Sequence, residues 1–203
     1  SGPFKVTEWV PNDHYTLVRN DNYWGEMPIA TSITCRVIPE GSARTIALEA
    51  GEIDVVWSVD PTDCANVESN PDVKLLSQPS TGIDYVGMNT QKEKFSDKRV
   101  RQAINYALDK QTFVDTIIEG RGLVANSYIN AAIPGWTDEV EAYPYDPEKA
   151  KELLAEAGYP DGFECSIFVN GDLRTRSAQI LQAQLADVGI KVDISTYEWG
   201  ALL

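Results

Sequence analysis

Residues 95–110 constrain the fold of this chain more than any other stretch, and they read FSDKRVRQAINYALDK. Apolar side chains recur there every three or four residues, the spacing that gathers them on one face of an α-helix. They are Val100, Ala103, Ile104, Ala107 and Leu108. Ser96 or Asp97 can cap the helix. Its charged side chains are expected to face solvent, and they are Lys98, Arg99, Arg101 and Lys110. The sequence therefore predicts an amphipathic helix with one face in a core.

The composition excludes several classes of protein. With 203 residues, 43% of them hydrophobic and 24% charged, the chain is long enough to fold around one or two cores. Its net charge of -14 repels phosphate backbones and anionic lipid headgroups, so nucleic acid is not an expected partner. No apolar run approaches the roughly 20 residues of a spanning helix, so no direct membrane insertion is expected. Ser1-Gly2-Pro3 lacks a signal-peptide pattern, so an export signal is expected to have been removed or to lie outside this sequence.

The first third of the chain is predicted to form a sheet with one crossover. Four strands are expected, at residues 4–9, 15–19, 31–38 and 53–57. A helix is expected at residues 42–50, with Ser42 as its N-cap and Gly51 just past its end. The order strand, helix, strand favours a right-handed parallel crossover. Asp60-Pro61 then opens a second short helix.

The rest of the chain alternates helices with strands. Helices are expected at residues 97–108, 111–118, 147–157 and 178–188, and strands at residues 83–89, 164–169 and 190–196. Turn-forming residues at 78–82 interrupt the pattern and mark the best domain boundary. The predicted fold class is α/β, with mixed β-sheets flanked by helices. One domain is expected at residues 1–82 and another at 83–203, with a hinge near residues 78–89.

Patterns for catalysis or metal binding are sparse. His14 is the only histidine, which argues against a hydrolase triad and a two-histidine metal site, and it is most simply a solvated turn residue. The GxGxxA pattern at residues 120–125 follows a helix rather than a strand, so it indicates a helix end and not a dinucleotide site. Cys35, Cys64 and Cys165 are expected to be buried free thiols, with a disulfide as the open alternative. No catalytic residue, metal or cofactor is expected.

Four stretches carry a resemblance to a known family. They are the long helix with Met88-Asn89-Thr90 before it, GPF at residues 2–4, RNDNYWG at 19–25 and ALEAGEID at 47–54. The sequences of these stretches resemble those of the extracytoplasmic solute-binding proteins of peptide and nickel ABC importers, bacterial extracellular solute-binding family 5. The resemblance implies a type II periplasmic-binding-protein-like fold. It covers nearly the whole chain, but the chain covers less than half of a full-length member, so the two-lobe architecture is expected to be incomplete.

An incomplete lobe has a physical consequence for the first domain. Its sheet is left with unpaired edges, which are sites of association. We therefore expect a partly exposed apolar seam within residues 1–82, which a second copy of the chain can cover.

The resemblance also implies a function. Members of the family bind di- or oligopeptides in a cleft between two lobes and deliver them to an ABC permease complex, so the chain is expected to be a binding protein and not an enzyme. The expected localisation is extracytoplasmic, in the periplasm or at the cell surface, with a lipid anchor in the full-length protein. Two alternatives remain: a peptide receptor or adhesion module on the same fold, and, less favoured, an α/β hydrolase.

Seven residues are the candidate ligand-binding positions: Ser80, Gly82, Asp84, Tyr85, Asn170, Arg174 and Trp199. In the family, the strand at residues 79–89 lines the cleft, and bound peptide is held mainly by main-chain hydrogen bonds. Arg174 can pair with a ligand carboxylate, although an ordinary helix start with Asp172 as its cap is also consistent with the sequence. Trp199 matches a cleft-facing aromatic residue of the peptide binders. Tyr85 and Trp199 can equally be core residues.

Overall fold

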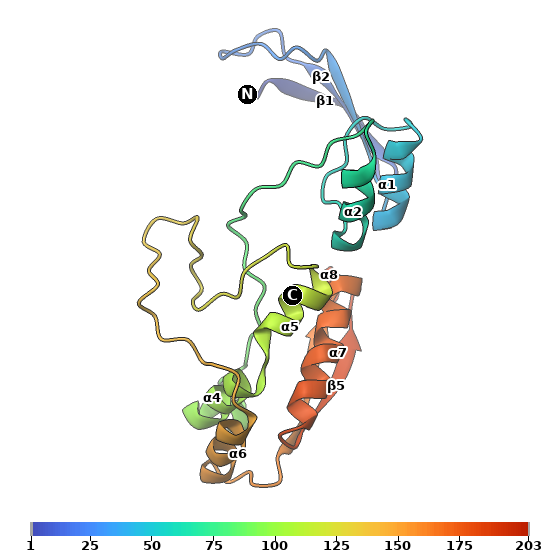
Figure 1. The fold of residues 1–203 in the computed structure, drawn as a ribbon. Coiled ribbons are helices and arrows are strands. Elements are labelled where there is room, and N and C mark those ends of the chain that lie inside the picture. Colours follow the sequence, from blue (N-terminus) through green and yellow to red (C-terminus); the bar gives the residue numbers. More distant parts are fainter. Residues whose placement is uncertain (1, 203) are drawn as a thin grey trace. The chain divides into compact units, whose positions relative to one another are not determined.

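The computed structural model describes residues 2–202, which form two compact units, one up to residue 75 and the other from residue 76 (Figure 1). The first unit contains a three-stranded antiparallel sheet with the order β1-β2-β3. Its elements are β1 (Phe4–Val10), β2 (His14–Arg19), β3 (Ser32–Arg36), α1 (Gly41–Glu49) and α2 (Pro61–Ser69). The first three predicted strands and both helices are therefore confirmed. The division into two lobes at residue 82 stays a prediction.

The fourth predicted strand and the parallel crossover are wrong. Residues 53–57 form no strand, and all three strands of the first sheet pair antiparallel. Gly51 and Ser58 adopt positive φ angles of 70° and 62°, which turn the chain on both sides of this segment. Trp57 is 88% exposed, so the apolar run finds no sheet to join among the described residues. Ser42 is also not a cap, because α1 begins one residue earlier, at Gly41, and Glu40 occupies the N-cap position.

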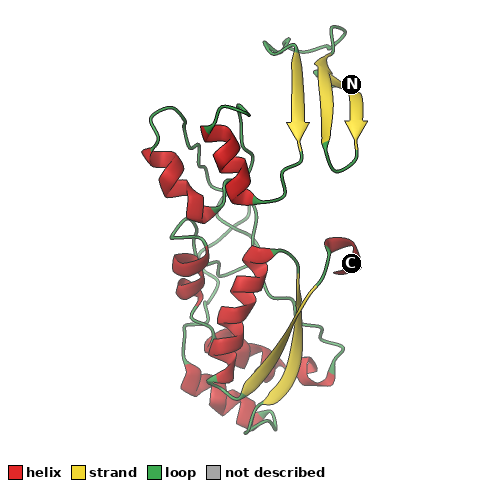
Figure 2. Cartoon of the chain, turned by 90° about the vertical axis from the view of Figure 1, so that its right-hand side faces the viewer, coloured by secondary structure: helices red, strands yellow, loops and turns green. Residues whose placement is uncertain are grey.

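One face of the β1-β2-β3 sheet is apolar and open. A bulge between Val6 and Glu8 shifts the register, so that Val6 and Trp9 both lie opposite apolar residues of β2. Directly opposed residues share a face, and Leu17 and Tyr15 are these partners. Trp9 is 74% exposed, and α1 and α2 lie beyond the end of the sheet and not over its face (Figure 2). The expected apolar seam is confirmed; its covering by a second copy stays a prediction.

His14, at the start of β2, contacts two carboxylates: that of Asp13 in the preceding turn and that of Glu8 across the hairpin in β1. Its Nδ1 lies 2.8 Å from Asp13 Oδ2, and its Nε2 lies 3.3 Å from Glu8 Oε2. Both contacts favour the charged imidazolium, so the hydrogen bond to Asp13 first, and that to Glu8 second, raise the pKa of His14 above its ordinary value. A raised pKa in the folded state means that the stabilisation is present below about pH 6.5 and disappears as the pH rises through the folded-state pKa.

We expect an NMR titration of His14 to give a midpoint above pH 6.5. The chain has one histidine, so the imidazole signal needs no assignment. Asp13→Asn and Glu8→Gln should each lower the midpoint, because each removes a carboxylate beside the ring. Asp21→Asn is the matched control, since Asp21 pairs with Arg19 instead. A midpoint at or below 6.5, or equal shifts in all three variants, would refute this assignment.

The second unit consists of helices around a two-stranded parallel sheet. Its elements are α3 (Glu93–Ser96), α4 (Lys98–Ala107), α5 (Lys110–Ile117), α6 (Pro147–Glu156), β4 (Phe163–Val169), α7 (Asp172–Ala186), β5 (Ile190–Thr196) and α8 (Trp199–Leu202). Helix α7 connects β4 to β5 and lies alongside β5 (Figure 1). The core contains the apolar face predicted for α4, together with Leu154 of α6 and Ile190 of β5. Helices α4, α5 and α6 and both strands are confirmed to within a few residues at their ends. The helix predicted at residues 178–188 is α7, which begins six residues earlier, at Asp172, and α3 was not predicted.

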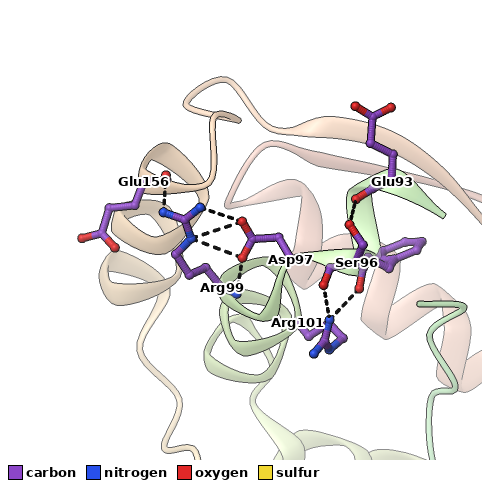
Figure 3. A network of polar contacts seen from close by, with 7 residues as sticks. Glu93, Ser96, Asp97, Arg99, Arg101 and Glu156 are labelled. Atoms are coloured by element: carbon purple, nitrogen blue, oxygen red, sulfur yellow. Dashed lines mark hydrogen bonds and ion pairs between the residues drawn. The ribbon is translucent and has the colours of Figure 1, made fainter. Parts of the chain in front are cut away.

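The charged side chains of α4 do more than face solvent. Asp97 caps the helix by accepting a 2.8 Å hydrogen bond from the Arg99 amide. The Arg99 side chain pairs with Asp97 and donates to the Glu156 carbonyl at 2.7 Å, which ties α4 to the end of α6 (Figure 3). Arg101 Nη1 donates to the carbonyl oxygens of Phe95 and Ser96, at 2.7 and 2.9 Å. Arg99 is thus exposed, as expected, and Arg101 is half-buried, but both also make hydrogen bonds within the unit.

The cysteines form no disulfide among the described residues. Cys35 and Cys165 are free thiols, and both are half-buried, not fully buried as the sequence predicted. Burial raises the pKa of the Cys165 thiol, which keeps it protonated and unreactive near neutral pH. Cys165 therefore acts as a small apolar side chain.

Candidate functional site

A cavity of about 530 Å³ lies at the carboxyl ends of β4 and β5. Ligands of α/β proteins bind preferentially at this edge of a parallel sheet. The cavity is lined by the residues that follow each strand and by the first turn of α7: Asn170, Gly171, Asp172, Thr175, Thr196, Tyr197, Glu198 and Trp199. Two of the candidate residues, Asn170 and Trp199, thus line one cavity although they are far apart in sequence.

Gly171 determines how the chain passes from β4 into α7. Its φ angle is 74°, in the left-handed region that glycine adopts without strain, and it occupies the N-cap position of the helix. Asp172 is therefore not the cap, as the sequence suggested, but the first residue of the helix. There its carboxylate lies 3.6 Å from Arg176 Nε and near the positive end of the helix dipole.

Arg174 connects two other candidates. Its Nη1 donates a 3.1 Å hydrogen bond to Asn170 Oδ1, and its Nη2 lies 3.8 Å from Asp84 Oδ1. The fold therefore brings Asp84 and Asn170 to the same guanidinium. Exposed pairs of this kind contribute about 0–1 kcal/mol, so a ligand carboxylate can replace Asp84 at little cost.

Ser80 and Gly82 form a separate group around a residue that the sequence did not indicate. Asn130 Nδ2 donates to the carbonyl oxygens of Ser80 and Gly82, at 2.9 and 3.2 Å. The Gly82 amide in turn donates to Ser80 Oγ at 2.9 Å. Asn130 lies in the irregular segment before α6, where neither periodicity nor spacing predicts a contact.

Tyr85 and Trp199 are surface residues. Tyr85 is 69% exposed and packs edge-to-face on Tyr128, with the ring centroids 5.5 Å apart. Trp199 is 55% exposed at the start of α8. The alternative that either is a core residue is therefore wrong, and both rings are accessible for stacking on a ligand.

The predicted strand at residues 83–89 is not formed. This segment is extended, yet none of the described residues makes a hydrogen bond to the main chain of residues 83–88. A strand exists only with a partner, and none is present within the described part of the chain. The main-chain donors and acceptors of residues 83–88 are therefore unpaired within the described part of the chain.

Neither a metal-binding cluster nor a membrane-spanning helix occurs within the described residues, 2–202. No group of three or more His, Cys, Asp or Glu residues could hold a metal ion there. Nor does any described helix have the length and hydropathy needed to cross a membrane.

The sequence matches the bacterial extracellular solute-binding proteins, family 5, over residues 1–203. It is 35% identical to heme-binding protein A of Haemophilus influenzae, with 98% of this chain and 38% of that protein aligned. It is 33% identical to the dipeptide-binding protein of Escherichia coli, covering 100% of this chain and 39% of that protein. The chain thus spans well under half the length of these relatives.

Among solved structures, the chain is similar to the ABC transporter-associated periplasmic binding protein DppA from Helicobacter pylori in complex with the peptide STSA. The TM-score is 0.91 at 35% identity, over 99% of this chain and 39% of that one. This similarity confirms the predicted type II periplasmic-binding-protein-like class, in an incomplete form. The match over all 203 residues shows that the chain belongs to the bacterial extracellular solute-binding proteins, family 5.

Proposed function

We propose that this chain is part of the substrate-binding component of an ABC importer, which binds di- or oligopeptides between two lobes and delivers them to a membrane permease. The protein acts outside the cytoplasm, held at the membrane by a lipid anchor, and it is not an enzyme. Family membership supports binding and transport, and two of its relatives are named for, or bound to, peptides.

The observation that carries the proposal is the open main chain of residues 83–88. Peptides of any sequence share one chemical feature, a regular series of main-chain N–H and C=O groups, and an unpaired extended segment binds that series by strand addition. Tyr85 lies within the segment and leaves its ring exposed. Asp84 in the same segment lies beside Arg174, a cation suited to a peptide carboxylate.

Binding of a ligand would also close the two lobes around it. A ligand that contacts both lobes binds the closed state more tightly than the open one, and only that difference in affinity shifts the equilibrium. The permease can then distinguish the closed, loaded form from the open, empty form.

The test is calorimetric titration of the full-length protein with short peptides, free amino acids and hemin, the last because one relative is named for heme. We expect peptides to bind with dissociation constants of about 1 μM or tighter, equivalent to about 8 kcal/mol. Amino acids and hemin should bind much more weakly. A folded full-length protein that binds hemin but no peptide would refute the proposal.

Trp199→Ala should weaken peptide binding by about tenfold or more, because an exposed tryptophan that becomes covered by a ligand is among the side chains that dominate binding energy. Trp57→Ala is the matched control: Trp57 is also exposed, but it belongs to the first unit and is not one of the candidate residues. Equal affinities for the two variants would remove Trp199 from the site.

A further inference from the structure

A second cavity, of about 360 Å³, lies within residues 76–203 and contains none of the seven candidate residues. One wall is the extended segment, through Val86 and Met88. A second is α4, through Lys98 and Arg101, and a third is formed by the rings of Tyr128 and Tyr143. None of the described residues that line it is acidic. In a chain with a net charge of -14, a cavity with two cations and no carboxylate is unusual.

The two arginines of α4 are not equally available to bind an anion. Arg99 is neutralised by Asp97, which binds it through both carboxylate oxygens (Figure 3). Arg101 makes hydrogen bonds only to the neutral carbonyl oxygens of Phe95 and Ser96, through Nη1. Those bonds fix its position without an ion pair, although Asp97 interacts with its charge at longer range, and the donors on Nε and Nη2 are still to be used.

Lys98 is exposed and forms no ion pair or hydrogen bond with the described residues. Lys110, which is next to Asp109, does not line the cavity but donates to the carbonyl oxygens of two lining residues, Asn105 and Tyr143, at 3.0 and 3.1 Å. Neither of the two cations that line the cavity forms an ion pair with the described residues, so an anion placed there gains charge-assisted hydrogen bonds.

We propose that this cavity is a specificity subsite that takes the acidic side chain of a bound peptide, with Lys98 and Arg101 as its carboxylate ligands. The inference rests on the proposed peptide binding, because Val86 and Met88 place the cavity directly beside the main chain that would pair with the peptide. In an extended peptide, alternate side chains point to the same face. For any one alignment of the peptide along residues 83–88, a single side chain therefore enters the cavity.

The size of the cavity agrees with this role. Sites for whole small ligands run from about 300 to 1,000 Å³, and this cavity lies at the lower limit, which suits one side chain and not a complete peptide. The methylene groups of a glutamate can pack on Met88 and Tyr143 while its carboxylate reaches the two cations. A peptide C-terminal carboxylate carries the same chemistry, and the experiment below separates the two sources.

The test measures the affinity of the full-length protein for Ala-Glu-Ala and Ala-Gln-Ala, which differ in charge but hardly in shape. We expect the glutamate peptide to bind about tenfold more tightly, and Lys98→Met to remove most of that preference. Lys74→Met, an exposed lysine in the first unit, is the matched control and should leave the preference unchanged. Amidated Ala-Gln-Ala reports on the C-terminal carboxylate: a Lys98-dependent loss on amidation, with no glutamate preference, would assign the subsite to the C-terminus and overturn the side-chain assignment.

The other outcomes are also decisive. Equal affinities of the wild-type protein for the glutamate and glutamine peptides would refute the subsite while leaving peptide binding intact. If no peptide binds at all, the proposed function itself fails. Lys98→Glu provides an independent check that does not disturb the Arg101 contacts: it should reverse the preference, so that Ala-Lys-Ala binds more tightly than Ala-Glu-Ala.

Discussion

Replacing Gly162 with alanine is expected to destabilise the second unit by about 3–5 kcal/mol, at the upper end of single-residue effects. Gly162 has a φ angle of 76°, which is strained for any residue with a Cβ atom. An added Cβ would also overlap the carbonyl group and Cα of Gly189, the residue just before β5. The obstruction is main chain, which cannot rotate away as a flexible side chain can. The start of β4 and the start of β5 would have to separate.

Gly158→Ala is the matched control for this prediction. Gly158 has a φ angle of 91°, but nothing lies within 4 Å of the position of its Cβ. Its replacement should cost only the backbone strain, about 1–3 kcal/mol. Urea unfolding of the two variants gives the difference in free energy, and hydrogen exchange of peptides from β4 and β5 locates it. Equal costs for the two substitutions would show that the close approach of Gly162 to Gly189 does not matter.

Local signals explain which elements could be predicted. Helices α4 and α6 were predicted correctly because each has its apolar spacing and its cap within a few residues of sequence. Asp97 accepts from the Arg99 amide, and Asp146 from the Lys149 amide, as their positions before the helices suggest. A helix satisfies its own hydrogen bonds, so its sequence contains most of what is needed to recognise it.

Strands depend on partners, and here prediction failed twice. Residues 53–57 and 83–89 have strand-like composition, but neither pairs with another strand in the described chain. The first is exposed between two turns, and the second remains extended without hydrogen bonds. A strand-like composition indicates that a segment can join a sheet. It does not indicate that a neighbouring strand is present for it to pair with.

The candidate site shows the same limit. The family resemblance singled out Asp84, Asn170 and Arg174 individually, and the structure places them in contact. No sequence pattern predicted the bonds from Asn130 to Ser80 and Gly82, nor the second cavity beside α4. Both depend on an irregular segment whose course is set by tertiary contacts. Such positions are visible only once the chain is folded.

Leu154→Ala should lower the free energy of unfolding of the second unit by about 2–5 kcal/mol. Leu154 is 1% exposed and lies on α6 in the cluster that includes Val100 of α4 and Ile190 of β5. Removing its side chain loses buried apolar area and leaves a cavity. The surrounding groups cannot easily move in to fill that cavity. Helices α4 and α6 are already packed closely through two small residues, Ala103 and Ala150.

The control for this substitution is the same chemical change at Leu123, which is 90% exposed in the same unit. Leu123→Ala should change the stability by no more than about 0.5 kcal/mol, because its side chain leaves little or no cavity behind. The urea midpoint should therefore fall for Leu154→Ala and stay in place for Leu123→Ala, with equal slopes if both unfold in two states. Hydrogen exchange should quicken in α4, α6 and β5 of the first variant alone. If Leu123→Ala were the more damaging change, the hydrophobic core would lie elsewhere, and the buried face of α4 would not be what holds this unit together.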